Sequence, residues 1–274
     1  MSRFYARYSS WAGLRTSMGK RMSFFITHGL RRALRSKWAI LVLVITYGLI
    51  VMPRVFAAMN PFFAFDPLSY FSLYDEMQLF IMLYAAVIGA GIIASDFNDK
   101  SIVLYFTKGF SKAGYAFGKL SVLFLSFSLV TILPLIVIFA VALISSDLGL
   151  DLIRDNIWVL AAGLSLGLLV TLLLTTLTAG LSSLLGDVRY AGASIFAIFF
   201  LSRLVSEILL SINGNEHMKL ISLWDNLSAV GTYLFRLDNP YGFPQLYPFL
   251  VIVGIIALSS LAVYYILFKK ELSL

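Results

Sequence analysis

One long polar break on the basic side of the chain, between two apolar runs, is DFNDKSIVLYFTKGFSKAGYAFGK, residues 96–119, which contains two aspartates and four lysines. Its first half has the composition of a short helix, a turn is expected around Gly109, and Ser111 is placed to cap a second helix. A segment this polar cannot cross a bilayer, so it must face water. A basic helix–turn–helix of this kind suits docking into a groove on a soluble partner, and it is unsuited to catalysis.

A phosphate-binding loop is suggested at first sight by Gly114, Gly118 and Lys119. That loop requires Gly-x4-Gly-Lys-Ser/Thr after a strand, because its backbone amides and its hydroxyl each have a fixed ligand. Ala113 stands at the required first glycine and Leu120 at the hydroxyl position, and no strand is expected before them. We therefore expect no ATP site in this chain.

Arg203 and Glu207 are charged residues one helical turn apart in an apolar run. A lone charge near the bilayer centre costs about 2.5–3.5 kcal/mol on insertion scales, and the i,i+4 spacing allows the two side chains to neutralise each other. Two interpretations stay open: the pair faces a translocation path, or it is a structural clasp near the outer surface. Gly163 and Gly167, also four apart, predict close helix packing, within the chain rather than at a subunit interface.

Metal sites and common catalytic motifs are not indicated. His28 and His217 fall in opposite leaflets of the expected topology, the chain has no cysteine, and neither His-Glu-x-x-His nor Gly-x-Ser-x-Gly occurs. Disulfides, thiolate metal sites and cysteine nucleophiles are therefore excluded, and an enzyme acting within the membrane is disfavoured.

The elements that must position these residues are membrane helices. Of the 274 residues, 60% are hydrophobic and 13% charged, and the mean hydropathy is +0.90. Ordinary soluble domains have about 45–50% apolar and about 25% charged residues, so lipid must cover part of this chain. The net charge of +7 is explained by basic residues that collect on the cytoplasmic side, and no nucleic-acid partner is expected.

The pattern predicts an all-α integral membrane protein with one membrane domain, residues 1–274. Residues 1–38 form a cytoplasmic tail and an amphipathic helix at 22–38, whose apolar face would lie in the headgroup plane with Arg31, Arg32 and Arg35 turned away from it. Residues 39–268 form a six-span bundle, and 269–274 a cytoplasmic tail. The expected spans are 39–59, 77–95, 117–145, 157–185, 190–212 and 247–268.

The distribution of charge predicts the orientation of the spans. The N-terminal tail, the 96–119 segment, the link after the fourth span and the C-terminal tail hold 16 of the 21 Lys and Arg residues. By the positive-inside rule these segments and both termini are cytoplasmic, which agrees with an even number of spans. The long segment 213–246 is then on the outer side, and its apolar pieces, too short to span, predict one or two re-entrant-like helices that dip into the outer leaflet.

The 96–119 segment resembles the corresponding loop in the permease subunits of type 2 ABC exporters. In that family the loop after the second span has an acidic residue, Gly-Thr four residues on, a hydrophobic run, a Pro-x-Ser-Arg turn and a Gly-Lys. This chain has the following residues at the same spacings: Asp96, Lys100-Ser101, the run 102–106, Gly109-Phe110-Ser111-Lys112 and Gly118-Lys119. Lys100 and Gly109 replace the usual Gly and Pro. The order of surface helix, six spans and long outer segment is also similar.

The resemblance implies that the segment is a coupling helix, which sits in a notch of an ATPase subunit and carries nucleotide-driven closure into the spans. The residues expected to dock on the ATPase are Asp96, Ser101, Lys108, Ser111, Lys112 and Lys119. Arg31, Arg32 and Arg35 would hold the surface helix on anionic lipid or on the same ATPase.

The resemblance also implies an assembly. Two permease chains, identical or paralogous, would pair in the plasma or inner membrane to form the substrate path, and ATP and Mg²⁺ would bind to two separate ATPase subunits, with no cofactor on this chain. One alternative is a membrane anchor or assembly subunit that recruits a soluble partner without moving a substrate. Another is a secondary transporter or membrane enzyme that acts alone.

Overall fold

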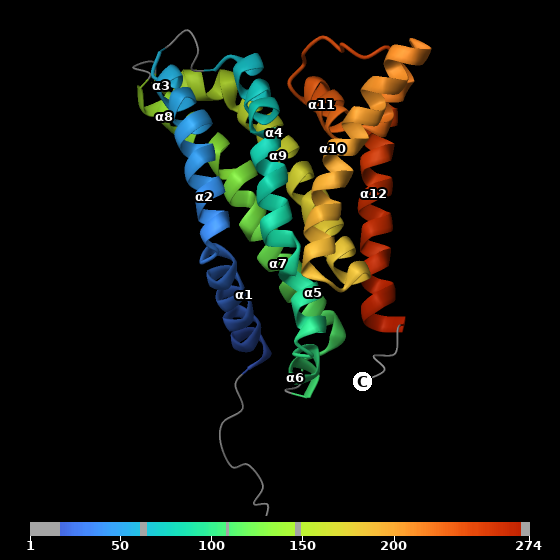
Figure 1. The fold of residues 1–274 in the computed structure, drawn as a ribbon. Coiled ribbons are helices and arrows are strands. Elements are labelled where there is room, and N and C mark those ends of the chain that lie inside the picture. Colours follow the sequence, from blue (N-terminus) through green and yellow to red (C-terminus); the bar gives the residue numbers. More distant parts are fainter. Residues whose placement is uncertain (1–16, 61–64, 108–109, 146–148, 270–274) are drawn as a thin grey trace, which may run out of the picture.

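The computed structural model describes residues 17–60, 65–107, 110–145 and 149–269, and every element in these parts of the chain is helical. Figure 1 shows the long helices standing side by side. Helices α1 (Met18–Leu34), α5 (Gly91–Asn98) and α6 (Ile102–Thr107) lie at one end, and α3 (Met52–Ala58), α8 (Leu133–Ser145) and α11 (Leu223–Leu234) lie at the other. We call these the α6 end and the α11 end. The first described helix begins at the α6 end, and the last one finishes there (Figure 1).

Within the described residues, six helical stretches are long and apolar enough to cross a membrane, which confirms the predicted number of spans and makes the chain a multi-pass membrane protein. They are Lys37–Ala58, Pro67–Asn98, Lys112–Thr131, Arg154–Leu185, Val188–Asn213 and Leu246–Phe268. The second span begins at Pro67, not at residue 77 as predicted, because Asp66 caps it by accepting hydrogen bonds from the amides of Leu68 and Ser69. The polar residues in its first half, such as Ser72, Asp75 and Gln78, form hydrogen bonds with side chains of other helices, so they do not end the helix.

The first two spans are each built from shorter pieces. The first consists of α2 (Lys37–Thr46), a π-helical turn (Tyr47–Val51) and α3 (Met52–Ala58). The second consists of α4 (Pro67–Gly89) and α5 (Gly91–Asn98), which meet at a break. The pieces follow one another along each span in Figure 1.

The predicted single helix 117–145 is in fact two helices, α7 (Lys112–Thr131) and α8 (Leu133–Ser145), and only α7 is long enough to span. Pro134 causes the break, because it has no amide hydrogen to donate within the helix. Tyrosines of other spans bind carbonyls near the break: Tyr47 donates to the Leu129 carbonyl at 2.6 Å and Tyr74 to the Thr131 carbonyl at 3.2 Å.

Helix α9 (Gly149–Leu185) packs against most of the other spans, among them α10 (Val188–Asn213) and α12 (Leu246–Tyr264), which a π-helical turn (Tyr265–Lys269) follows. On α9, Gly163 faces Leu135 of α8, and Gly167 lies so close to Tyr74 that an added Cβ would be 2.7 Å from its hydroxyl. Both glycines therefore allow close packing within the chain, as predicted.

The segment 213–246 contains a 3₁₀ helix (Glu216–Ile221) and α11 (Leu223–Leu234). Trp224, Leu227 and Val230 of α11 are buried, while Ile221, the last residue of the 3₁₀ helix, is exposed. Helix α11 packs against α9 and α12, so most of its surface contacts protein.

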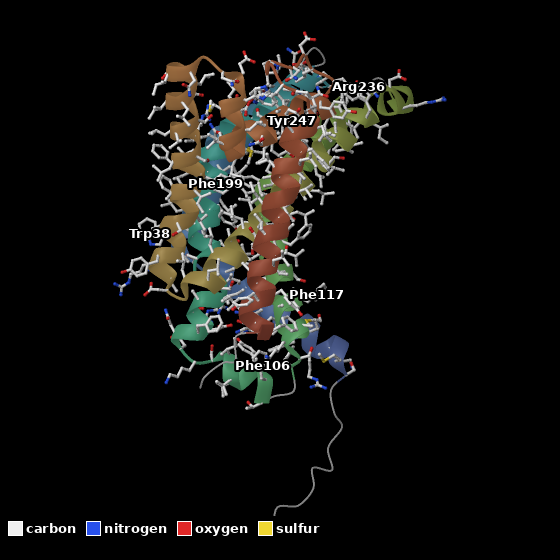
Figure 2. All side chains as sticks on the ribbon, turned by 90° about the vertical axis from the view of Figure 1, so that its right-hand side faces the viewer. Trp38, Phe106, Phe117, Phe199, Arg236 and Tyr247 are labelled. Carbon is white, nitrogen blue, oxygen red and sulfur yellow. The ribbon has the colours of Figure 1, made fainter. Side chains whose placement is uncertain are left out.

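The amphipathic helix α1 (Met18–Leu34) ends four residues earlier than predicted, because Ser36 caps the next helix by accepting from the Ala39 amide. Trp38 therefore belongs to the first span and not to the apolar face of α1. Its side chain is 69% exposed and points away from the bundle in Figure 2, where Phe106 marks the α6 end and Arg236 and Tyr247 the α11 end.

Candidate functional site

Asp96 lies near the end of α5 with only 2% of its surface exposed. Its Oδ2 accepts a hydrogen bond from the Tyr115 hydroxyl at 2.6 Å and forms an ion pair with Lys119 Nζ at 2.7 Å. Its Oδ1 accepts a hydrogen bond from Ser101 Oγ at 3.2 Å. Both carboxylate oxygens are therefore paired, as a charge removed from water requires. We call Asp96, Ser101, Tyr115 and Lys119 the Asp96 cluster.

Aromatic rings surround the ammonium of Lys119, which is 9% exposed. Nζ lies 5.9 Å from the ring centres of Phe25 and Tyr105, and 5.6 Å from that of Tyr115. The negative faces of these rings replace part of the lost water. Burial raises the pKa of Tyr105, and the negative charge of Asp96 raises it further, so Tyr105 stays neutral beside the ion pair.

The turn between α5 and α6 (Ile102–Thr107) brings Ser101 back to Asp96. At this turn Lys100 has φ 52°, a left-handed conformation. A side chain in this conformation costs about 1–2 kcal/mol, because its Cβ crowds the following carbonyl, and glycine avoids the cost. Position 100 is thus a place where the backbone favours glycine and the sequence supplies lysine.

The break between α4 and α5 sets the position of α5. Ser182 of α9 donates to the Ala90 carbonyl at 2.9 Å and accepts from the amides of Ile93 at 3.2 Å and Ala94 at 2.9 Å. One hydroxyl therefore binds three backbone groups at the break, as serine side chains do in membrane helices. This contact fixes α5, and with it Asp96, to α9.

Helix α1 runs beside the first half of α7 in the same direction. A Cβ at Gly114 would meet Met18 and Met22, one at Gly118 would lie 2.5 Å from the Phe25 ring, and Gly29 lies against Val122. The apolar face predicted for the headgroup plane therefore packs on protein for much of its length. Gly114 and Gly118, excluded above as a phosphate loop, are the flat surface that receives it.

The outward side of this end of the molecule carries the remaining residues expected to dock. Ser111 caps α7 by accepting from the Gly114 amide at 3.0 Å, as predicted, and Lys112 follows it. Leu104 of α6 is 59% exposed. Lys108 lies outside the described residues. Of the six expected docking residues, Ser101 and Lys119 both bind Asp96, so these three hold the segment in shape and do not present their polar groups to a partner.

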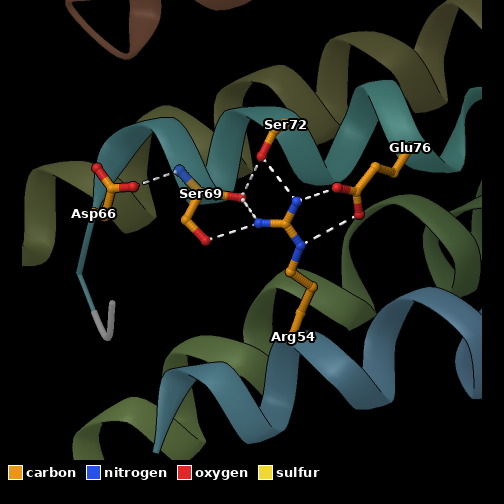
Figure 3. A network of polar contacts seen from close by, with 5 residues as sticks. All are labelled: Arg54, Asp66, Ser69, Ser72 and Glu76. Carbon is orange, nitrogen blue, oxygen red and sulfur yellow. Dashed lines mark hydrogen bonds and ion pairs between the residues drawn. The ribbon is translucent and has the colours of Figure 1, made fainter. Parts of the chain in front are cut away.

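Polar side chains also connect the first two spans near the α11 end (Figure 3). Arg54 forms an ion pair with Glu76, donates to Ser69 Oγ at 2.9 Å and to the Ser69 carbonyl at 3.0 Å, and donates to Ser72 Oγ at 3.0 Å. Its planar guanidinium thus contacts three residues of α4 at once. The arrangement clamps α3 to α4, and all of its donors and acceptors belong to the two helices.

Arg203 and Glu207 do not form the ion pair that their spacing predicted: no salt bridge joins them in the described part of the chain. Arg203 instead donates to Gln78 Oε1 of α4 at 2.7 Å, because this acceptor on the neighbouring span is within reach. Close by in sequence, Asp75 accepts from Trp224 Nε1 at 3.0 Å. These contacts connect α4 to α10 and α11.

No group of three or more histidine, aspartate or glutamate residues within the described ranges could hold a metal ion. The Asp96 cluster is likewise without a cavity of its own or an activated nucleophile, and its geometry is that of a buried joint between α1, α5, α6 and α7. No protein-family model matches the chain, and no curated protein is significantly similar to it.

Two residues of this joint, Tyr115 and Phe25, were not predicted from the sequence. Tyr115 is one helical turn before Lys119 on the same face of α7, and this i,i+4 spacing was the available signal. Phe25 carried no local signal, because only the packing of α1 on Gly118 brings its ring to Lys119.

Proposed function

We propose that this chain is the membrane subunit of an ATP-driven exporter of the type 2 ABC class. It pairs with a second permease chain, identical or paralogous, and with separate ATPase subunits that bind ATP and Mg²⁺. The α6 end faces the cytoplasm, as the distribution of basic residues indicates, and α6 with its flanking turns is the coupling helix.

The Asp96 cluster is the observation that carries this proposal. Three of the positions on which the family resemblance rests, Asp96, Ser101 and Lys119, meet in one buried hydrogen-bonded group. In addition, the family has glycine where this chain has Lys100, and Lys100 adopts the left-handed backbone that glycine favours. The spacings that this chain shares with the family therefore have a physical reason, because they bring Asp96, Ser101 and Lys119 together.

A rigid joint of this kind suits the transmission of movement. A force applied to α6 reaches α5 through Asp96 and Ser101, α7 through Tyr115 and Lys119, and α9 through the hydroxyl of Ser182. Since each of these helices continues into a membrane span or is one, displacement of α6 moves spans and not a flexible loop. ATP binding in the partner would then bias the bundle between two arrangements.

Reconstitution with a partner tests the proposal. The tagged chain is expressed with candidate ATP-binding-cassette proteins of its source genome, purified in mild detergent, and the stoichiometry and nucleotide-dependent turnover of the complex are measured. We expect two ATPases for each pair of membrane chains. Purification of the chain with a soluble protein that hydrolyses no nucleotide would instead favour the anchor or assembly role.

Charge reversal separates docking from folding. The double variant Lys108→Glu/Lys112→Glu should lose the ATPase while the spans still insert. Arg154→Glu is a charge-reversal control at the other end, because Arg154 is an exposed cation near the start of α9, away from the α6 end. Equal retention of the ATPase by both variants would refute the docking role.

A further inference from the structure

A cavity of about 770 Å³ lies between α1 on one side and the α4–α5 span on the other. Its volume is within the range of small-molecule sites, about 300–1,000 Å³. The Asp96 cluster touches it only through Lys119, so it is a separate feature of this end of the molecule.

The wall formed by α1 is basic. Lys20, Arg21 and Arg32 line it together with His28, and no aspartate or glutamate among the described residues does. Within the described residues neither Lys20 nor Arg32 has a carboxylate partner at salt-bridge distance. Arg32 and His28 are one helical turn apart on this wall, and Lys20 lies two turns before His28. Side chains at this spacing share one face of a helix, so they can bind an anion together.

The opposite wall is apolar and belongs to the membrane-spanning helices. Val87, Ile88 and Ile92 of the second span line it, together with Val188 at the start of α10. Phe24, which is 74% exposed, lies on α1 at the same cavity. A ligand that satisfies both walls must carry a negative charge at one end and a hydrocarbon body at the other.

We propose that this cavity binds one anionic phospholipid, with its phosphate at His28 and Arg32, its remaining headgroup toward Lys20, and its acyl chains against Val87, Ile88 and Ile92. The apolar wall is part of a membrane span, which favours a lipid over a soluble anion or an acidic protein segment. The site differs from general attraction of a basic helix to the membrane, since Arg31 and Arg35 of the same region do not line the cavity.

Native mass spectrometry of the delipidated full chain tests this proposal. The probes are phosphatidylglycerol, phosphatidylcholine with the same acyl chains, and glycerophosphoglycerol, which has the headgroup without the chains. We expect retained phosphatidylglycerol at one copy for each chain. The double variant Lys20→Gln/Arg32→Gln should weaken this binding about 30-fold, the effect of two cations near a lipid phosphate.

Arg31→Gln/Arg35→Gln is the matched control, because it removes the same charge from the same region but not from the cavity, and its binding should change less than about 3-fold. Equal losses in both double variants would overturn the proposal in favour of surface electrostatics. Binding of phosphatidylcholine as strong as that of phosphatidylglycerol would also overturn the proposal. Equally strong binding of glycerophosphoglycerol would overturn it in favour of a site for a free anion.

A third variant keeps the charge and fills the cavity. Ile92→Trp should weaken phosphatidylglycerol binding by occupying the space of the acyl chains, with size-exclusion and circular-dichroism profiles as the check on folding. Unchanged lipid binding in Ile92→Trp would contradict the assignment of the apolar wall even if the charge variants failed to fold.

Discussion

Removal of single charges from the Asp96 cluster tests whether it is a joint. Lys119→Met leaves the buried Asp96 carboxylate with only its bonds from Tyr115 and Ser101. Asp96→Asn removes the negative charge, so the Lys119 ammonium is left with a neutral amide oxygen and the surrounding rings. Breaking a buried ion pair by removing one partner costs about 3–5 kcal/mol. We expect each single variant to lose about 3 kcal/mol or more of its free energy of unfolding.

The double variant Asp96→Asn/Lys119→Met leaves no unpaired charge and should be no less stable than either single variant. The coupling energy of the double-mutant cycle is then about 3 kcal/mol, roughly a 150-fold change in the equilibrium constant. Equilibrium unfolding in mixed micelles, followed by tryptophan fluorescence, measures all four proteins. Additive losses, with a coupling energy under about 0.5 kcal/mol, would refute the reasoning, because the two side chains would then act independently.

Further predictions follow from other parts of the structure, and each is checked by the same unfolding measurement. Lys100→Gly should raise the free energy of unfolding by about 1 kcal/mol by relieving the left-handed backbone, whereas Asp99→Gly, at a right-handed position, should lower it. Arg54→Lys should cost about 1–2 kcal/mol, because an ammonium cannot bind Glu76 and the serines in the same plane. Ser182→Ala should cost about 1–3 kcal/mol by leaving buried backbone groups at the helix break without a partner. Burial raises the pKa of the Asp225 carboxyl, so the folded chain binds a proton there more readily than the unfolded chain does. The free energy of unfolding should therefore rise as the pH falls from the folded pKa toward the ordinary carboxyl range. Asp225→Asn should abolish that rise and increase stability at neutral pH.

The features predicted well from sequence are those that depend on local pattern. The six spans follow from runs of apolar residues, and the N-cap at Ser111 follows from a serine at the start of such a run. The close packing at Gly163 and Gly167 could also be predicted, since small residues four apart are typical of helix–helix contacts in membranes.

The features that sequence did not predict depend on contacts between distant segments. The expected ion pair of Arg203 with Glu207 was wrong because Gln78, far away in sequence, is the better placed acceptor. Asp96 and Lys119 were taken as exposed, since a polar loop gives no sign that its charges are paired internally. The early start of the second span at Pro67 was missed for a related reason: Asp75 has a partner in α11 that hydropathy cannot detect.

Site-specific crosslinking at α6 tests the central claim most directly. The chain contains no cysteine, so Leu104→Cys introduces a single thiol at an exposed position of α6, and Arg154→Cys provides the control near the start of α9. In native membranes a thiol-directed photocrosslinker at position 104 should capture an ATP-binding-cassette protein, more strongly in one nucleotide state than in another, and position 154 should not. Capture of no nucleotide-hydrolysing protein at position 104, under conditions in which the transport complex is intact, would contradict the account.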